Sequence, residues 1–369
     1  MSVRTRRAVD ALPEYKVARN AEAVKKEYGL SSLIKLAANE NTLGFSPAVF
    51  EALKALTSRY PDGAAAALRK RLSERLNVPS DHIVFGSGSF ELIQLACLAF
   101  LEGGEETLGA EPSFGWYKTA TAIMGGVFRG IPVTSNYSVD LDALSRAVTE
   151  RTKIIWLCNQ NNPTGTIFTG EQLEAFLAKI PDSVLVVLDE AYVDFVEQPG
   201  YPQSLLLYQK YENLVVFRTF SKLEGLASLR VGYAIGSAPI IAALNKVRIQ
   251  SNVNQAAQLA ALASLDDEEF KARTIQNART EKQKFYRAFT RLGFSYVPSN
   301  TNFIFFDIKR EAAPIVEEFI RHGILIRGGN EYGFPTHIRI SIGTPEENDA
   351  AIAVFNKLFL PIEKQSQNR

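Results

Sequence analysis

The middle of this chain alternates short, almost wholly apolar runs with longer amphipathic segments, and this alternation limits the folds that it can adopt. Apolar runs fit strands that are buried on both faces of a sheet, and the segments between them fit helices that cover such a sheet. The pattern therefore predicts an α/β fold with a mostly parallel sheet. The strand candidates are residues 83–85, 153–157, 184–188, 214–217 and 231–235, and the helix candidates are 91–101, 141–148 and 171–179.

The pattern changes after about residue 265. A long charged helix is predicted over 266–291, and shorter strands and helices follow it, which is typical of a smaller α+β domain. We therefore expect a large domain over 36–265, with an N-terminal arm (1–35) and a small C-terminal α+β domain (266–369). The later elements are expected at 302–306, 324–327 and 338–342 for strands and at 313–321 and 346–358 for helices.

Composition and charge argue against several classes of protein. The chain has 41 Lys and Arg against 40 Asp and Glu, so it lacks the basic surface that binds nucleic acid or anionic membranes. Its two cysteines form no CxxC pair and its three histidines have no metal-ligand spacing, so we expect neither a disulfide scaffold nor a metal site.

The longest apolar run, near 92–101, is about half of the ~20 residues that a membrane helix needs. No secretory signal follows the N-terminal arginines, and we expect a cytoplasmic protein.

A glycine-containing turn, Gly86-Ser87-Gly88-Ser89, joins the first predicted strand to an apolar helix. Glycines allow close approach of the backbone, Ser89 is suited to cap the helix, and the free amides of a helix N-terminus attract an anion. A plain strand–helix turn explains the same residues equally well. Glu91 occupies the third glycine position of GxGxxG, which excludes a dinucleotide fingerprint.

Two adjacent carboxylates, Asp189 and Glu190, follow the run at 184–188, at the strand end where α/β proteins bind ligands. The pattern is similar to the acidic motif of P-loop ATPases, but the chain has no GxxxxGK[ST]. The acid must therefore serve another cation, for which a protonated heterocyclic nitrogen is suited. A helix-capping role remains the alternative for Asp189 taken alone.

A single lysine, Lys222, lies between the hydroxyl residues Thr219 and Ser221 and a segment that ends in Arg230. Hydroxyl groups and Arg suit a phosphate, and a poorly solvated Lys near other cations is a candidate amine nucleophile.

A fourth polar turn, over residues 159–165, contains Asn161 and Asn162, whose amides can donate to a ligand, although such a loop needs no function. One site that binds an anion, a cationic nitrogen and an amine would explain all four turns. Pyridoxal 5′-phosphate (PLP) has this chemistry, with a Schiff-base lysine, an Asp at the pyridinium nitrogen and a phosphate at a helix N-terminus.

These residues resemble the fold-type I PLP-dependent aminotransferases, specifically the histidinol-phosphate aminotransferase group, over nearly the whole chain. The sharpest matches are NNPTG at 161–165 and SK…GLA..R at 221–230. The resemblance implies a seven-stranded, mostly parallel sheet between helices in the large domain. Further matches lie at 39–44, 60–62, 112–114 with Tyr117, 189–192, Arg327 and 339–343.

The resemblance implies roles around PLP for a subset of the matched residues. Lys222 would bind the cofactor covalently and move a substrate proton, and Asp189 would keep the ring nitrogen protonated. Asn162 and Tyr192 would hydrogen-bond the ring hydroxyl, and Phe114 would stack on the ring. The implied phosphate ligands are Ser89, the Phe90 backbone, Thr219, Ser221, Arg230 and Tyr60, the last from the partner subunit of a homodimer.

The substrate contacts that the resemblance implies are Tyr15, on the N-terminal arm, Asn39, Arg327 and Arg339. Arg339, helped by Arg327, would bind the phosphate of one substrate and a carboxylate of the other, because a planar guanidinium suits both. The implied reaction moves an amino group between L-histidinol phosphate and 2-oxoglutarate or glutamate, in histidine biosynthesis.

The chain departs from the group's pattern at two places. The glycine-containing turn usually continues with Asp-Glu, but here it continues as Ser89-Phe90-Glu91. Related aromatic-amino-acid aminotransferases also lack the acid at the position of Phe90. Residues 15–18 lack the group's usual Pro-Gly turn. Three alternatives stay open: a phenylalanine or tyrosine aminotransferase, a threonine-phosphate decarboxylase, and a PLP-binding protein without turnover. A few pocket contacts decide substrate specificity, and the sequence pattern does not identify them.

Overall fold

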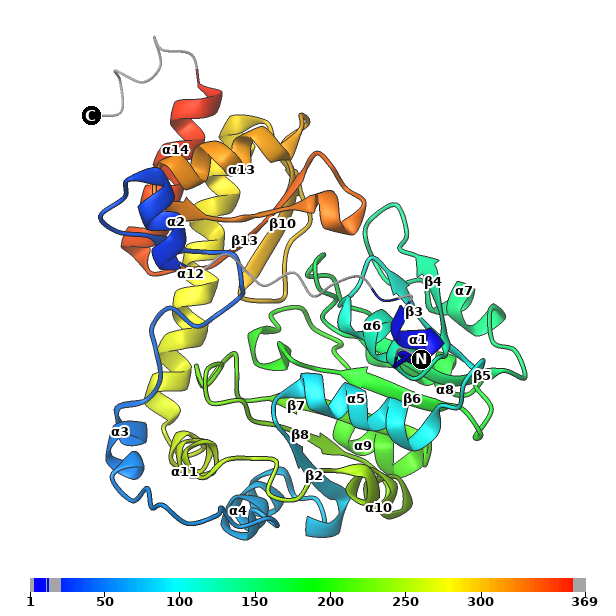
Figure 1. Ribbon diagram of the computed structural model, residues 1–369. Coiled ribbons are helices and arrows are strands. Elements are labelled where there is room, and N and C mark those ends of the chain that lie inside the picture. The colour runs from blue at the N-terminus through cyan, green and yellow to red at the C-terminus, as the bar shows by residue number, and fades with distance from the viewer. Residues whose placement is uncertain (1–2, 11, 13–20, 361–369) are drawn as a thin grey trace.

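The computed structural model describes residues 3–10, 12 and 21–360. A seven-stranded sheet of order β2-β8-β7-β6-β5-β3-β4 forms the centre of the larger lobe (Figure 1). Six of its strands are parallel, and β8 runs antiparallel to both neighbours. The strands are β2 (Ile83–Gly86), β3 (Glu106–Glu111), β4 (Val127–Pro132), β5 (Thr152–Cys158), β6 (Leu185–Asp189), β7 (Leu214–Thr219) and β8 (Gly232–Ile235).

The strands of this sheet are apolar throughout because successive residues enter two different cores. In β5, Ile155 and Leu157 pack in a core with α3, α4, α7, α8, α9 and α11, whereas Ile154 and Trp156 pack with α5, α6 and α10 on the other face. The helices are α3 (Pro47–Leu53), α4 (Ala66–Leu76), α5 (Ser89–Phe100), α6 (Trp116–Ile123), α7 (Leu141–Arg146), α8 (Gly170–Leu177), α9 (Ser204–Lys210), α10 (Ala238–Val247) and α11 (Gln255–Ser264), with a short 3₁₀ turn, η1 (Ser80–His82), before β2.

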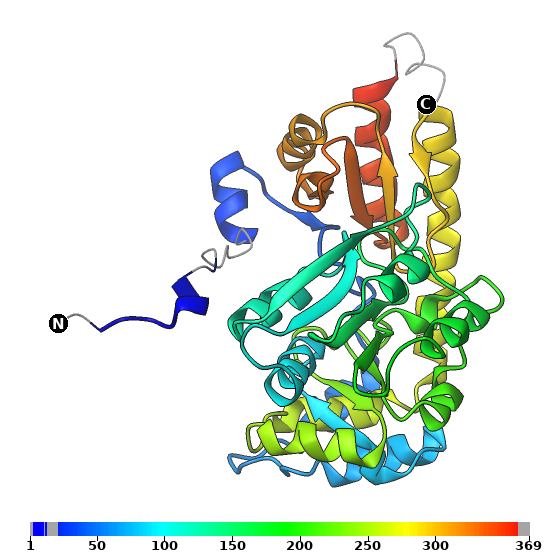
Figure 2. The same cartoon turned by 90° about the vertical axis from the view of Figure 1, so that its right-hand side faces the viewer.

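A four-stranded antiparallel sheet of order β12-β13-β10-β9 forms the second lobe. Helix α12 (Glu268–Leu292) begins in the larger lobe and runs into the core of the second (Figures 1 and 2). Its 25 residues span about 38 Å at 1.5 Å per residue. The other elements are β9 (Ser295–Tyr296), β10 (Phe303–Asp307), α13 (Ala312–Arg321), β12 (Arg327–Gly328), η3 (Gly329–Tyr332), β13 (His337–Ser341) and α14 (Pro345–Phe359).

The described part of the N-terminal segment, which was predicted as an arm outside the large domain, contacts both lobes. Strand β1 (Ile34–Lys35) pairs with β11 (Ile324–Leu325) of the second lobe. On α2 (Ala21–Tyr28), the Tyr28 hydroxyl donates to Glu317 of α13 at 2.8 Å. The short α1 (Arg7–Asp10) lies near α6 of the larger lobe (Figure 1). Tyr15 lies outside the described residues.

The predicted α/β class with a mostly parallel sheet is confirmed. The single strand expected at 324–327 is wrong, because β11 and β12 belong to different sheets. The domain boundaries at 36 and 265 stay a prediction, although the strands of the seven-stranded sheet all lie between them. Within the described part of the chain, no helix is both long and apolar enough to cross a bilayer.

Candidate active site

The polar turns singled out in the sequence meet at the carboxyl edge of the parallel strands, where the larger lobe faces β13 of the second. Asp189 ends β6 and Thr219 ends β7. Asn162, which follows β5, accepts a hydrogen bond of 2.6 Å from Nη1 of Arg339 on β13. This edge is the usual ligand site of α/β sheets, and here it is closed by a second sheet.

Asp189 is 3% exposed and lies at the centre of this edge. Its Oδ2 accepts a hydrogen bond from the Tyr117 hydroxyl at 2.7 Å, and its Oδ1 accepts from the Ala191 amide at 3.1 Å. Burial raises the pKa of Asp189 to about 6, while these two hydrogen bonds act in the opposite direction. A buried carboxylate of this kind is stabilised by an adjacent cation, so Asp189 fits the ring nitrogen of PLP.

Tyr117, the partner of Asp189, is a site residue to which the sequence analysis assigned no role. It lies on α6, is buried, and stacks on Trp156 with ring centroids 5.0 Å apart. Phe114 meets its ring edge-on at 5.6 Å. The signal that could have found Tyr117 is its spacing of three residues from Phe114, because the turn that opens α6 brings them together, with the Tyr117 amide donating to the Phe114 carbonyl oxygen at 3.2 Å.

Lys222 lies on the turn after β7. Its Nζ donates to the carbonyl oxygen of Asn39 at 3.0 Å and lies 5.4 Å from the ring centroid of Tyr192. Burial, followed by the charge of Arg339, lowers the pKa of Lys222 to about 8. A lysine in these surroundings loses its proton more readily than a solvated one, as a nucleophilic amine requires.

Asn39 connects Lys222 to the second lobe. It has a left-handed backbone with φ of 55° and is 1% exposed. Its backbone amide donates to Oγ of Ser341 at 2.8 Å, and its side chain donates to the Tyr192 hydroxyl at 3.1 Å. Asn302 donates to the same carbonyl oxygen as Lys222, at 3.1 Å. These contacts fix the position of Lys222, while the predicted substrate contact of Asn39 stays a prediction.

Arg339 is 5% exposed and lies beside Asn162. It also donates to the Tyr332 hydroxyl at 3.1 Å and to the carbonyl oxygen of Ala37 at 2.7 Å. Its Nε is buried and has no hydrogen-bond partner among the described residues. A buried guanidinium with an unpaired N–H is suited to receive an anion, because leaving such a donor unpaired is unfavourable.

Arg327 lies directly opposite Arg339 in the pairing of β12 with β13. Its guanidinium is half exposed and binds the Glu331 carboxylate through two N–H groups, one of them at 2.8 Å. Glu331 raises the pKa of Arg327. The two predicted anion-binding arginines are therefore brought together, and one of them already has a carboxylate partner.

The predicted phosphate ligands lie around Gly88, which has a φ of 75°. A Cβ at this position would lie 2.3 Å from Nη2 of Arg230, so only glycine leaves room for that guanidinium. Gly88 precedes α5 and Ser89 is the first helical residue, so the expectation that Ser89 caps the helix is wrong. The Oγ1 of Thr219 donates to Oγ of Ser221 at 2.9 Å. Hydroxyls, a guanidinium and a helix N-terminus fit a phosphate.

Phe90 is 43% exposed and joins an aromatic cluster beside the α5 turn. Its ring centroid lies 5.1 Å from those of both Phe114 and Trp116. The Trp116 indole donates to the Phe90 carbonyl oxygen at 3.1 Å. The side chain of Phe90 thus packs on Phe114, the residue predicted to cover the cofactor ring.

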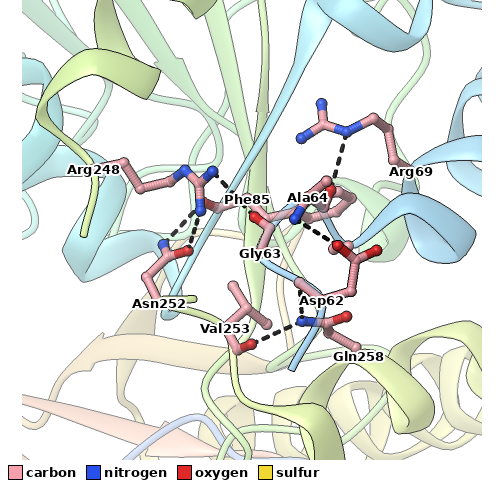
Figure 3. Close-up of a pocket in the computed structure, with 10 residues that line it drawn as sticks. Asp62, Gly63, Ala64, Arg69, Phe85, Arg248, Asn252, Val253 and Gln258 are labelled. Carbon is pink, nitrogen blue, oxygen red and sulfur yellow. Dashed lines mark hydrogen bonds between the residues drawn. The ribbon is translucent and has the colours of Figure 1, made fainter. Parts of the chain in front are cut away.

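Tyr60 lies on the loop between α3 and α4 and is 95% exposed. Figure 3 shows how the residues after it are anchored. The carbonyl oxygen of Gly63 accepts from Arg248 at 3.1 Å, and that of Asp62 accepts from Gln258 at 2.9 Å. The loop is therefore held by several bonds while the Tyr60 side chain extends into solvent.

Behind the Lys222 turn lies a cavity of about 290 Å³ whose lining includes Glu190 and Arg218. The Oε2 of Glu190 accepts from Nε and Nη2 of Arg218, at 2.9 and 2.8 Å. Glu190 is fully buried. The second acid of the Asp189-Glu190 pair thus forms an ion pair behind the site.

Comparison with known proteins identifies the family. The profile described as "Aminotransferase class I and II" matches residues 31–355. The chain belongs to this family. The histidinol-phosphate aminotransferase of Geobacillus thermodenitrificans (strain NG80-2) is 42% identical over 351 residues, which cover 94% of this chain and 96% of the relative. That of Bacillus subtilis (strain 168) is 42% identical over 360 residues, which cover 97% and 100%.

Solved structures agree with this assignment. The histidinol-phosphate aminotransferase of Sinorhizobium meliloti, in complex with pyridoxal-5′-phosphate, superposes with a TM-score of 0.89 at 26% identity and covers 97% of this chain and 99% of its own. The aminotransferase described here gathers most residues predicted from its sequence, while Tyr60 lies exposed on the loop between α3 and α4. Those gathered are Asn39, Ser89, Phe90, Phe114, Asn162, Asp189, Tyr192, Thr219, Ser221, Lys222, Arg230, Arg327 and Arg339.

Proposed function

We propose that this aminotransferase uses PLP to transfer the amino group of L-histidinol phosphate to 2-oxoglutarate, a step of histidine biosynthesis. The observation that carries the proposal is the buried Arg339, whose Nε is unpaired and which lies opposite Arg327 beside the Lys222 amine. Two adjacent guanidiniums suit substrates that carry a phosphate or a second carboxylate. The two relatives that are 42% identical are named histidinol-phosphate aminotransferases.

PLP, when bound, supplies an electron sink for the substrate carbanion. Lys222 would hold it covalently, and its Nζ would take and return the proton at the substrate Cα. Asp189 would keep the ring nitrogen protonated. Asn162 and Tyr192 would hydrogen-bond the ring hydroxyl, and Phe114 would cover the ring.

The phosphate group of the cofactor would bind at the turn that Gly88 opens. The α5 amides of Ser89 and Phe90 would donate to it, together with the hydroxyls of Thr219 and Ser221. Arg230 would supply the positive charge. Its position over Gly88 supports this role, because the guanidinium lies against the turn from which the amides emerge.

Arg339 binds the anionic group of either substrate, and Arg327 adds a second guanidinium when a phosphate enters. The Glu331 carboxylate holds Arg327 through Nε and Nη2, which leaves its Nη1 for the substrate. Asn39 lies beside Tyr192 and is assigned to the same substrate pocket. Tyr15 of the N-terminal arm is assigned there from the sequence resemblance alone.

A cytoplasmic homodimer in which Tyr60 reaches the phosphate of the partner's cofactor belongs to the same proposal. Exposed apolar side chains support it: Phe50 is 62% exposed, Leu56 48%, Tyr60 95% and Ile249 73%. They lie on neighbouring segments, because Gln255 accepts from the Thr57 amide at 2.9 Å and Arg248 donates to Gly63. Exposed apolar side chains on neighbouring segments are typical of a protein interface.

Subunit mixing tests the crossing of Tyr60. Tyr60→Ala and Lys222→Ala are each expected to impair the enzyme. If Tyr60 acts on the partner's site, a hybrid of the two variants contains one site with both residues intact, so mixing and refolding them should restore activity. No rescue in a mixture that forms hybrid dimers would contradict the proposal.

The substrate assignment is tested by single-turnover absorbance of the lysine-bound cofactor. L-Histidinol phosphate and L-phenylalanine are compared side by side, with threonine phosphate as a third reactant whose CO₂ release is followed. We expect rapid conversion with histidinol phosphate. Preference for phenylalanine would make the protein an aromatic aminotransferase, release of CO₂ would make it a decarboxylase, and no conversion would indicate a PLP-binding protein without turnover.

A further inference from the structure

Three alternate residues of β13 each bind a different segment of the chain. Ser341 binds Asn39, Arg339 binds Asn162, and the Nε2 of His337 lies 3.0 Å from the Tyr137 hydroxyl. Alternate residues of a strand share one face, so the three contacts form a row. The first two belong to the site already described, whereas the third involves residues with no role in it.

Tyr137 lies in the loop between β4 and α7 and has a left-handed backbone with φ of 62°. This conformation is uncommon for a bulky side chain and persists only where the surroundings fix it. Here the Tyr137 amide donates to the Thr134 carbonyl oxygen at 2.8 Å, and the Thr134 amide donates to that of Ser138 at 2.9 Å. The loop thus holds Tyr137 in a defined orientation toward β13.

Tyr137 is also connected to the loop that carries Asn162. Its carbonyl oxygen accepts from Oγ1 of Thr166 at 2.9 Å, and the hydroxyls of Thr166 and Thr164 are 2.9 Å apart. The carbonyl group of Tyr137 is therefore connected to the loop of Asn162, and its hydroxyl is connected through His337 to β13, the strand of Arg339. Together with the chain from His337 to Arg339 and from Asn162 to Thr166, the contacts form a closed ring that includes the hydrogen bond between Asn162 and Arg339.

His337 is held firmly at its end of this ring. It is 6% exposed, and its imidazole stacks on Phe305 with ring centroids 4.9 Å apart. Its Nδ1 lies 3.2 Å from the Thr336 hydroxyl and 4.0 Å from Oδ1 of Asp307, the charged group that faces it. Burial lowers the pKa of His337, and Asp307 opposes that shift.

We propose that Tyr137 and His337 are a positioning pair that sets Arg339 against Asn162 and so determines the affinity of the site for the anionic groups of its substrates. The inference rests on the proposed function of Arg339 as the anion receptor. Neither residue takes part in proton transfer. Without their contact, β13 keeps Arg339 but is less constrained relative to the Asn162 loop, so the spare N–H of Arg339 is directed less accurately.

The test measures binding of succinate, an unreactive dicarboxylate, to the PLP-loaded enzyme by calorimetry. The variants are Tyr137→Phe, His337→Phe and the double variant, which remove the hydrogen bond and keep an aromatic ring at each position. We expect each single variant to raise the Kd for succinate about three- to tenfold, as loss of one hydrogen bond predicts. The double variant should be no worse than either single variant, because both remove the same contact.

Activity gives a second readout. The KM for glutamate should rise by the same factor as the Kd, while kcat and the absorbance of the lysine-bound cofactor stay as in the unmodified enzyme. Tyr296→Phe is the matched control, since Tyr296 stacks on Tyr286 with centroids 4.6 Å apart, in the second lobe. That variant should leave the Kd unchanged.

Three results would overturn the inference: an unchanged Kd in both single variants, additive effects in the double variant, or a cofactor spectrum that changes together with the Kd. An unmodified enzyme that binds no succinate would overturn it as well. A failure of the proposed function would be distinguished from a failure of this inference. Conversion of histidinol phosphate is measured on the unmodified enzyme and does not enter the comparison of succinate affinities.

Discussion

The Tyr117 hydroxyl donates a hydrogen bond of 2.7 Å to Oδ2 of Asp189, and both residues are buried. Burial alone favours the neutral carboxylic acid, whereas a hydrogen bond to the carboxylate favours the ionised form. Tyr117 thus limits how far burial raises the pKa of Asp189. The ionisation of the predicted nitrogen partner is controlled by a side chain on α6.

Replacement of Tyr117 by Phe should raise the pKa of Asp189 above its value of about 6. Because Asp189 acts when ionised, the acidic limb of the kcat/KM profile should move to higher pH, by about one unit. The profile is measured between pH 5 and 9 with Tyr208→Phe as the control, which removes another buried hydroxyl. An acidic limb that stays in place would show that Tyr117 does not control Asp189.

The substitution Gly88→Ala should weaken cofactor binding at least about tenfold, equivalent to about 1.4 kcal/mol. The added Cβ would lie 2.3 Å from Nη2 of Arg230 and displace that guanidinium. Gly104→Ala is the control, since Gly104 has a similar φ of 87° but no atom within 4 Å of the added Cβ. PLP titration of the apoprotein compares the two, and equal losses would assign the effect to backbone strain alone.

The substitution Arg339→Ala should weaken glutamate binding about 100-fold, because a buried charged contact to the substrate is lost. The lysine-bound cofactor should remain. Since the charge of Arg339 lowers the pKa of Lys222, the reaction of the apoprotein variant with PLP should also require higher pH. Arg321→Ala, on the exposed side of α13, is the control. Loss of PLP with normal glutamate affinity would refute the assignment.

The substitution Arg218→Met should destabilise the fold by about 3–5 kcal/mol, since it leaves the buried Glu190 carboxylate without its charged partner. The double variant Arg218→Met/Glu190→Leu should recover part of this loss, because the uncompensated Glu190 charge is removed while Asp194 still loses the nearby Arg218 charge. Lys54→Ala, which breaks an exposed pair with Glu51, should cost at most about 1 kcal/mol. Urea unfolding of the holoenzyme measures all three, and similar midpoints would contradict the expectation.

The sequence predicts the central strands well where both faces are apolar, as in β5 and β6. It missed β3 and β4, because polar residues and glycines interrupt them. A charged residue such as Glu106 of β3 is expected on the surface. In the structure it is buried, with 8% of its surface exposed, and its carboxylate accepts from Arg129 of β4 at 3.2 Å. A local pattern cannot indicate a partner supplied by a neighbouring strand, so burial of a charged residue is seen only in the folded chain.

The site shows the same limit. Lys222, Asp189 and Asn162 are identified by short motifs, since each lies at the carboxyl end of a strand or within a few residues of it. The contact of Tyr117 with Asp189 joins residues 72 apart, and that of Tyr137 with His337 joins residues 200 apart. Neither pair forms a motif, because their proximity results from how the sheets and helices pack.

Helix α12 connects the second lobe, which carries Arg339, to the larger lobe. It is capped in the larger lobe by Asp267, whose carboxylate accepts from Ser46, and it packs in the second lobe through Phe285 and Phe289. A tilt of about 5° at its first turn would displace its far end by about 3 Å, given its length. Small adjustments at Ser46 and Asp267 would therefore shift the second lobe, which carries Arg339 on β13, relative to the larger lobe.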